Sequence, residues 1–568
     1  MNPAASTLTQ PTLEAIVLRI ADKAALPSQR ARRRLAQALR QSLRTPVAGW
    51  QVLRVPASQA LEYDLVPPAG TKFSAAEGWS LSYALAALPD VQHAEPSFQV
   101  LQDAEPAAEA PPTTQLPLPA ALPTFDSCAD DRPPAQVDEQ DLDWNGQLVD
   151  IRCAWQLQPP SPPPGFPPGQ RRGRGIRIGH PDSGYRHHPD LFDEPPGQPC
   201  RLNTRLERDF VDSGRRAEHP EGGHGLNTAS VIMSSDLTGF VVGAAPEAEL
   251  VPLRVTRPRL GLPAPILFES GARHLRDAIR YAVHRADCHV ISISLGWFGN
   301  SSLHEAVREA VQKNVIVVAA SGNYVPLVVW PAAYPEVIAV AGCNAQRRPW
   351  PGASTGPQVD VSGPAARVWV AGFTQNGLPA ASQSNGTSFA TATLAGIAAL
   401  WLAFHGRAFL LDRYHNECTL NDVFRFLVRQ TSDPFSTYAP SGYGAGIYNA
   451  RRILATPLPT PADLALSRPA ALPRRPDPLA PFQDAFPDLP HELLTERLAG
   501  LLQVDTAELD SRLAGVQDEL LFHLTTHPAL RTYLAAPPAA ADSSPAKAAA
   551  APPLEPTELS ETLRRRLR

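Results

Sequence analysis

The feature that most constrains the fold is a regular alternation of apolar runs and amphipathic stretches in the middle of the chain. Five runs rich in Val, Ile and Ala indicate strands that are apolar on both faces, at 175–182, 249–255, 289–296, 314–323 and 336–342. Two stretches between them, 272–286 and 303–313, have apolar residues at helical spacing. Strands of this kind that alternate with helices are typical of a parallel sheet covered on both sides. The sequence therefore predicts a doubly wound α/β domain with a mostly parallel sheet.

Two proline-rich segments divide the chain on either side of this pattern. Proline accounts for 62 of the 568 residues, about twice its usual share of about 5%. Much of it lies in 105–137 and 456–490, where repeated Pro and Ala favour semi-rigid extended linkers over regular helix. These linkers bracket a central domain of residues 138–455.

Residues 1–104 form a separate predicted module of the α+β type. The pattern of apolar residues favours a helix near 30–44, a strand at 51–55, a helix at 79–88 and a strand at 97–101. This order of elements predicts a small folded module ahead of the first linker.

The C-terminal region is predicted to be a helical hairpin at 491–534, followed by an Ala/Pro-rich tail at 535–568 that we expect to be disordered apart from its Arg-rich end. Asp505 and Glu508 have the spacing of a capping box ahead of a leucine stripe. Two interpretations are open at this point: a satellite that packs on the central domain, or a helix pair that binds a protein partner.

The overall charge argues against two classes of partner. A net charge of −5 and a pI near 6.3 give no general attraction to nucleic acid or to anionic membranes. The arginines of 30–44 are therefore interpreted as a solvated helix face. The most apolar stretch, 394–404, is shorter than the roughly 20 residues needed to span a bilayer. We expect neither nucleic acid nor a membrane as a partner.

The cysteines and the N-terminus bear on cellular location. Six cysteines are scattered without a CxxC pair, at Cys128, Cys153, Cys200, Cys288, Cys343 and Cys418. They indicate neither a zinc site nor a dense disulfide framework, so free thiols are expected. The first residues lack the basic and apolar segments of a signal peptide. Both observations predict a cytoplasmic protein, with another route of export left open.

The segment 384–402, SNGTSFATATLAGIAALWL, carries the strongest chemical signal. Its short polar turn delivers Ser388 to the start of an apolar helix, where unpaired N–H groups and the helix dipole favour developing negative charge. A serine hydroxyl needs a base and an oxyanion site to act as a nucleophile. Taken alone, the motif is equally consistent with an ordinary helix cap.

Three further residues supply what Ser388 would need. His224 lies between glycines in EGGHGLNTASVIM, and Asp182 ends the predicted strand 175–182. Asn323 ends the predicted strand 314–323, where an amide can donate to an oxyanion. Catalytic groups of open α/β sheets collect at the carboxyl ends of strands, so we expect these side chains to lie close together.

With these motifs, the sequence resembles the subtilisin-like serine proteases, the subtilase family. The order Asp182, His224, Ser388 is the order in that family. Further matching segments are VVGAAPEAELVPLRV, VISISLG, PAAYPEVIAVAG and GYGAGIYNARRIL, and WNGQLVDIRCAW resembles the family's lead-in to its first core strand. The resemblance covers about 138–455 and implies a subtilisin-like fold.

The resemblance also implies roles for individual residues. Ser388 would be the nucleophile, His224 the general base, and Asp182 the group that holds the imidazole in the required tautomer. Asn323 would form the oxyanion hole with the Ser388 N–H. The segments expected to flank a polypeptide substrate are Ser294, Leu295 and Gly296 together with Ala320, Ser321 and Gly322.

No cofactor is expected, and the resemblance leaves calcium open without a clear site in the sequence. His180, His187 and His188 lie near Asp182 and can be drawn as a metal cluster. The His-Pro-Asp-Leu that follows the aspartate is part of the family pattern, however, which favours a structural role.

The end of the N-terminal module, 83–101, resembles the last helix and strand of the family's inhibitory propeptide. This implies that the module 1–104 is an intramolecular inhibitor that acts until the linker 105–137 is cut. A permanently attached regulatory domain is the alternative.

The leading hypothesis is a serine endopeptidase made as a self-inhibited precursor. A catalytically silent, protease-like binding protein and an esterase or transacylase with the same triad are the alternatives.

Overall fold

The structure of the chain is a computed structural model. It describes residues 12–20, 49–55, 61–89, 91–103, 128, 137–192, 201–260, 266–437, 441–467, 489–527 and scattered positions between 479 and 566, apart from 213, 221–222, 236–240, 297, 326, 375 and 416. The predicted helix near 30–44 and most of the linker 105–137 lie outside these residues.

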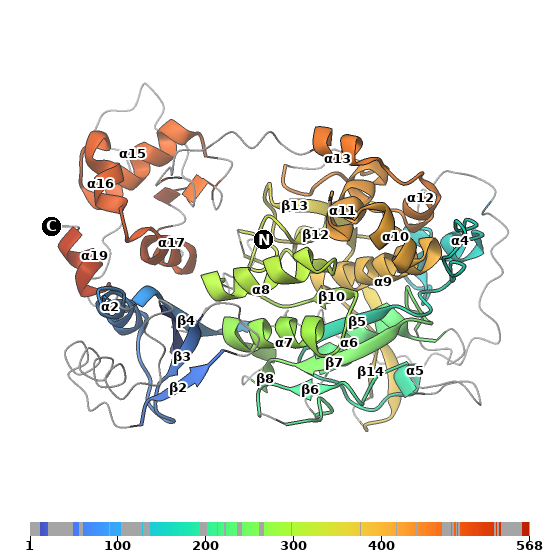
Figure 1. Cartoon of the computed structure of the whole chain (residues 1–568), viewed down its shortest axis with the longest axis horizontal. Helices are drawn as coiled ribbons and strands as arrows, with labels where there is room; N and C mark the ends of the chain where they lie inside the picture. Colours follow the sequence, from blue (N-terminus) through green and yellow to red (C-terminus); the bar gives the residue numbers. More distant parts are fainter. Residues whose placement is uncertain are drawn as a thin grey trace. The chain divides into compact units, whose positions relative to one another are not determined.

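The chain divides into two compact units (Figure 1). The larger comprises Met1–Thr7 and Leu101–Pro469, and the smaller comprises Leu8–Val100 and Ala470–Arg568. The N-terminal module and the C-terminal helices therefore belong to the same unit, although most of the chain separates them in sequence.

A seven-stranded sheet forms the centre of the larger unit, in the order β13-β12-β11-β10-β5-β7-β6. Neighbouring strands pair in parallel throughout. The strands are β5 (Arg177–Asp182), β6 (Arg208–Asp209), β7 (Glu249–Arg254), β10 (Val290–Ile293), β11 (Ile316–Ala320), β12 (Ile338–Cys343) and β13 (Val359–Pro364). The predicted doubly wound α/β fold is confirmed.

Helices cover both faces of this sheet (Figure 1). One apolar core holds α6 (Gly223–Met233), α9 (Thr387–His405) and α11 (Leu420–Thr431). The other holds α7 (Ala272–His284) and α8 (Ser301–Gln312). Neighbouring strand residues divide between the two cores, as Val290 and Ile291 do, because successive side chains of a strand point to opposite faces.

The helix α9 is buried along its whole length. It is long and apolar enough to cross a membrane, but all of that window lies inside the protein. Its composition is that of a central core helix, which has no polar face because it has no solvent side.

Shorter elements complete the larger unit. Two antiparallel hairpins are formed by β8 (Arg257–Leu260) with β9 (Ile266–Gly271) and by β14 (Val368–Phe373) with β15 (Pro379–Ser384). The remaining helices are α3 (Trp144–Leu148), α4 (Ile151–Gln156), α5 (Pro189–Phe192), α10 (Arg407–Arg413), α12 (Ala450–Ala455) and α13 (Pro461–Ser467).

The beginning and the end of the central domain are joined directly. The Ala450 N–H donates to Val149 O at 2.8 Å, and Asn449 Nδ2 donates to Asp150 Oδ2 at 2.7 Å. These bonds close the domain around its sheet, so the segments resembling the family's lead-in and closing motifs meet in space.

The N-terminal part of the smaller unit is an antiparallel sheet with one helix. Its strands pair in the order β2-β3-β1-β4, with β1 (Thr12–Ile20), β2 (Gln51–Arg54), β3 (Glu62–Val66) and β4 (Val91–Asp103). The helix α2 (Ala75–Ala86) begins at a capping box of Ser74 and Glu77. The predicted α+β type is confirmed for the described residues of the module.

The C-terminal helices differ from the predicted simple hairpin. They are α15 (His491–Leu502), the 3₁₀ turn η2 (Thr506–Glu508), α16 (Leu509–Leu513), α17 (Gln517–Thr526) and α19 (Glu561–Arg566). The capping box at Asp505 and Glu508 is absent, because Asp505 accepts from the N–H of Ala507 and caps the 3₁₀ turn instead.

Two short helices lie outside the predicted hairpin, and one of them contradicts the prediction of a non-helical linker. The helix α13 lies in the predicted linker 456–490, and its Pro461 is its first residue, where a missing N–H costs nothing. The helix α19 lies at the Arg-rich end of the tail, which the sequence analysis left out of the predicted disorder, and Leu559 and Leu563 are buried there.

The expectation that all cysteines are free is wrong for two of them. Cys128 and Cys153 form a disulfide across a sequence separation of 25 residues. Cys200 lies outside the described residues. Because disulfides persist mainly in oxidising compartments, this bond removes the cysteine argument for a cytoplasmic location.

Two of the other thiols are buried in the sheet cores. Burial raises the pKa of the Cys288 thiol and raises that of Cys343 to about 12. Since the thiolate is the nucleophilic form, both thiols are inert near neutral pH.

We expect the disulfide to stabilise the larger unit. A loop of this length makes a disulfide worth about 3 kcal/mol through the entropy of the unfolded chain. Cys153→Ser should lower the free energy of unfolding by about that amount in urea titrations, whereas Cys418→Ser should leave it within about 0.5 kcal/mol. Equal unfolding midpoints for Cys153→Ser and the unsubstituted chain, without reductant, would contradict the stabilising role.

Candidate active site

Ser388 lies in the first turn of the buried helix α9. Gly386 precedes the helix, and its N–H donates to Ala365 O at 2.7 Å, which fixes the entry of the chain. The side chain of Ser388 is therefore held at a helix N-terminus next to the carboxyl ends of the central strands, where the sequence placed it.

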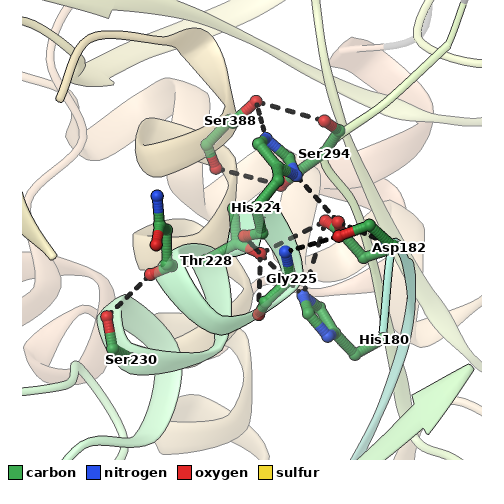
Figure 2. A network of polar contacts seen from close by, with 10 residues as sticks. His180, Asp182, His224, Gly225, Thr228, Ser230, Ser294 and Ser388 are labelled. Carbon is green, nitrogen blue, oxygen red and sulfur yellow. Dashed lines mark hydrogen bonds and ion pairs between the residues drawn. The ribbon is translucent and has the colours of Figure 1, made fainter. Parts of the chain in front are cut away.

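His224 lies between Ser388 and Asp182 in a continuous chain of hydrogen bonds (Figure 2). Its Nε2 is 3.2 Å from Ser388 Oγ, and its Nδ1 donates to Asp182 Oδ1 at 2.7 Å. The next residue must be glycine, because a Cβ at Gly225 would lie 1.8 Å from Gly184 O. This close approach brings the start of α6 against the end of β5.

Asp182 is completely buried at the end of β5. Burial alone would raise the pKa of its carboxyl group, but the charge and hydrogen bond of His224, the nearby His180 and the Ser183 N–H lower it below its usual value. The Ser183 N–H donates to Asp182 Oδ1 at 2.6 Å. Asp182 is thus a carboxylate in a dry environment, stabilised by donors around it.

Two further residues support this carboxylate (Figure 2): Thr228, which the sequence analysis did not name, and His180, to which it gave no role in the site. The Thr228 hydroxyl, one turn after His224 on α6, lies 3.2 Å from Asp182 Oδ2. His180 Nε2 lies 2.9 Å from the Thr228 hydroxyl. Burial lowers the pKa of His180 although Asp182 opposes the shift, which favours the neutral imidazole. The only sequence signal for Thr228 was its spacing from His224, which places both side chains on one helix face.

Asn323 is oriented by Thr387, another residue that the sequence analysis gave no role of its own. The N–H of Thr387 donates to Asn323 Oδ1 at 3.0 Å, and its hydroxyl lies 2.9 Å from the same oxygen. Both contacts engage the acceptor end of the amide, which leaves Nδ2 as the end that donates. Gly322 has a φ of 110°, a left-handed conformation that favours glycine and turns the chain at Asn323.

Ser294, the residue after β10, contacts Ser388. Its hydroxyl donates to Ser388 O at 3.0 Å, and its own carbonyl lies 3.1 Å from Ser388 Oγ. The predicted substrate residue Ser294 therefore lies directly against the predicted nucleophile. Leu295 follows it half-buried, and a Cβ at Gly296 would lie 2.1 Å from Trp330 O.

The second predicted substrate segment is Ala320, Ser321 and Gly322. Ala320 ends β11. The Ser321 N–H donates to Val340 O at 3.0 Å, and its carbonyl accepts from Val329 N at 2.9 Å. The backbone of Ser321 is thus engaged within the protein, and Val329 lies against Gly322.

The histidines near Asp182 have separate structural environments. The ring of His187 stacks on Phe192 at 4.2 Å, while His188 Nδ1 accepts from the Asp190 N–H at 3.1 Å. Among the described residues, no group of three or more His, Cys, Asp or Glu side chains is arranged to hold a metal ion.

Comparisons with known proteins decide the family. The model of the subtilase family of peptidases matches residues 173–446. The thermostable alkaline protease of Halalkalibacterium halodurans is 31% identical over 289 residues, which are 49% of this chain and 68% of that protein. This chain belongs to the subtilase family. The family is one of serine-type endopeptidases, so the predicted enzyme class is confirmed.

One further relative and one solved structure show the same similarity. Subtilisin E of Bacillus subtilis is 30% identical over 245 residues, and these cover 41% of this subtilase and 57% of that protein. Among solved structures, the crystal structure of MycP1 with the N-terminal propeptide removed has a TM-score of 0.40 and 23% identity, covering 56% of this chain and 98% of that chain.

The contact between Thr387 and Asn323 leads to a prediction for this subtilase. Thr387→Val removes the hydroxyl but keeps the side chain's shape, so we expect kcat for peptide hydrolysis to fall about fivefold, as for the loss of a hydrogen bond of about 1 kcal/mol. KM should change little, because the contact orients Asn323 and not the substrate.

Two further variants control this measurement. Asn323→Ala should lower kcat by about 10²- to 10³-fold, and Thr387→Ser, which keeps the hydroxyl, should retain most of the activity. A loss of equal size in Thr387→Ser and Thr387→Val would contradict the orienting role of the hydroxyl.

Proposed function

We propose that this subtilase hydrolyses peptide bonds through an acyl-enzyme, with Ser388 as the nucleophile and His224 as the general base. The observation that carries the proposal is the continuous chain of hydrogen bonds from buried Asp182 through His224 to Ser388, at 2.7 and 3.2 Å. A polypeptide is the proposed substrate, and the steps use side chains of this chain.

The first step is the transfer of the Ser388 proton. The hydroxyl has one hydrogen and two neighbouring acceptors, His224 Nε2 at 3.2 Å and Ser294 O at 3.1 Å. Attack on a carbonyl carbon requires the hydrogen to point at His224, which takes it as the C–O bond forms. The same proton then passes from His224 to the leaving amine, and a water molecule repeats the sequence to release the acyl group.

Asp182 would keep His224 ready for this transfer. Its bond to Nδ1–H fixes the tautomer that exposes the lone pair of Nε2, and its charge stabilises the imidazolium that forms. The lowered pKa of Asp182 keeps it ionised at neutral pH. Thr228, held by His180, is proposed as a positioning residue for the carboxylate.

Asn323 and the N-terminus of α9 would stabilise the oxyanion. The Ser388 N–H is among the first in the helix, and such groups have no partner within the helix. Asn323 Nδ2 would supply the second donor, because Thr387 engages the amide oxygen. Two donors fixed before the reaction stabilise developing charge without the cost of reorganisation.

Replacing Ser388 tests the proposal. Ser388→Ala should lower kcat for a peptide substrate by about 10⁶-fold, abolish labelling by a fluorophosphonate probe, and leave the thermal unfolding midpoint nearly unchanged. Ser382→Ala, at the exposed position of β15, is the matched control and should behave as the unsubstituted chain.

The possible outcomes separate the enzyme from its alternatives. Hydrolysis and labelling that persist in Ser388→Ala would overturn the assignment. An unsubstituted chain that binds polypeptides but neither hydrolyses them nor is labelled would establish a binding protein, and turnover of esters alone would establish an esterase.

We further propose that the N-terminal module, 1–104, inhibits the catalytic unit until the linker 105–137 is cut. Its resemblance to the family's propeptide at 83–101 corresponds to the end of α2 and to β4. The capping box at Ser74 and the antiparallel sheet give it the character of a folded domain and not of a flexible leader.

A shortened chain tests the inhibitory role. A chain that starts at Ser127 keeps Cys128 and so its disulfide, but lacks the module. We expect it to hydrolyse peptides at least tenfold faster than the intact, uncleaved chain, and residues 1–104 added in trans should reverse the gain. Equal activity of the two chains, with matching thermal unfolding of the larger unit, would overturn the inhibitor role.

A further inference from the structure

The two ends of the chain share one compact unit, and their contact surface has no role in the proposed chemistry. We propose that the C-terminal helices are the binding partner of the N-terminal module, so that both ends form one body joined to the catalytic unit by two linkers. The contact itself does not depend on the proposed activity. Only its consequence for activation rests on the proposed inhibitory role.

The centre of the contact is aromatic. Phe522 of α17 is 1% exposed, and its ring centroid lies 4.7 Å from that of Phe98 on β4 and 6.2 Å from that of Trp79 on α2. Trp79 in turn lies 6.0 Å from Phe98. Trp79 and Phe98 are 4% and 7% exposed. Buried aromatic side chains that cluster in this way contribute most to binding at protein interfaces.

The position of Phe522 on α17 separates it from the helices' own core. A leucine cluster with α15 holds Leu513 of α16 together with Leu520, Leu521 and Leu524 of α17. Phe522 lies on the other side of α17 from Leu520 and Leu524, because residues two apart on a helix point about 160° away from each other. One face of α17 thus packs within the C-terminal helices, while the other packs on the N-terminal module.

A second contact joins α19 to α2. Leu559 and Leu563 form a buried cluster with Val516, against which Tyr83 of α2 packs. The backbone N–H of Glu561 donates to Ser80 Oγ at 3.2 Å. The α19 segment therefore adds both apolar and polar contacts to the surface centred on Phe522.

A buried carboxyl group links α17 to the segment that leads into α19. Glu519 of α17 is completely buried and accepts from the N–H and the hydroxyl of Ser560, at 2.7 and 2.6 Å. Burial raises the pKa of Tyr83, and the neighbouring Glu519 raises it further. A buried polar group costs free energy unless it is hydrogen-bonded, so the burial of Glu519 depends on Ser560, the residue before α19, lying against α17.

The contact between the two ends of the chain changes the effect of a cut in the first linker on release of the N-terminal module. After a cut within 105–127, the N-terminal module would still be bound to the C-terminal helices, which the second linker attaches to the catalytic unit. The effective concentration of the module then remains that of a tethered domain. Release of the module would need either a second cut after α13 or dissociation of the aromatic contact.

The test uses the full chain with Ser388→Ala, so it gives the same answer whether or not the proposed activity is correct. One recognition site for a specific protease is placed within 110–120 and a second within 470–476, and an affinity tag is added after Arg568. After both cuts, capture through the tag should retain the N-terminal fragment with the C-terminal fragment in a ratio near one to one.

Two variants locate the contact. Phe522→Ala should lower retention of the N-terminal fragment at least tenfold, whereas Phe486→Ala, which trims an aromatic side chain at the edge of the leucine cluster, should leave retention unchanged. Leu563→Ala provides a second interface variant if Phe522→Ala alters the helical circular dichroism. Absence of the N-terminal fragment from the captured material, or equal retention in Phe522→Ala and Phe486→Ala, would overturn the inference.

Discussion

The hydrogen bond between buried Asp182 and His224 is the interaction on which the rest of the site depends. A carboxylate that is completely buried is costly unless donors and positive charge compensate it. Here the Ser183 N–H, the Thr228 hydroxyl and His224 do so. The same donors fix the orientation of the Asp182 carboxylate, which in turn fixes the orientation of the His224 imidazole. The compensation that makes the buried charge tolerable is therefore also what aims His224 at Ser388.

The parallel sheet makes this arrangement possible. Asp182 ends β5, while Ser294 and Asn323 follow β10 and β11. The carboxyl ends of neighbouring parallel strands meet at one edge of the sheet. The helices α6 and α9 start at the same edge and bring His224 and Ser388 with their N-termini. The first and last segments of the domain are held together by the contacts of Ala450 with Val149 and of Asn449 with Asp150.

Much of this could be predicted from the sequence, because strands buried on both faces and a wholly apolar helix leave strong patterns. The candidate residues Asp182, His224 and Ser388 could also be found, since glycines and strand ends mark them. The supporting roles of His180, Thr228 and Thr387 could not, because each depends on a hydrogen bond between elements distant in sequence. The pairing of Cys128 with Cys153 depends likewise on proximity in the fold. In the sequence, nothing distinguishes Phe522 from the other apolar residues of its helix. Only the packing of α17 shows that Phe522 lies on the opposite face from the leucine cluster.

The disulfide limits where a protease can cut the first linker and thereby separate its two ends. Cys128 lies in that linker and is bonded to Cys153 of α4, so the downstream end of the linker is fixed to the larger unit. A cut before Cys128 leaves Cys128 bonded to Cys153 on the side of the larger unit. A cut between Cys128 and residue 137 leaves the upstream piece attached through the disulfide, and the piece separates only on reduction. In an oxidising compartment, a cut that breaks the covalent connection through the first linker must therefore fall before Cys128, within 105–127.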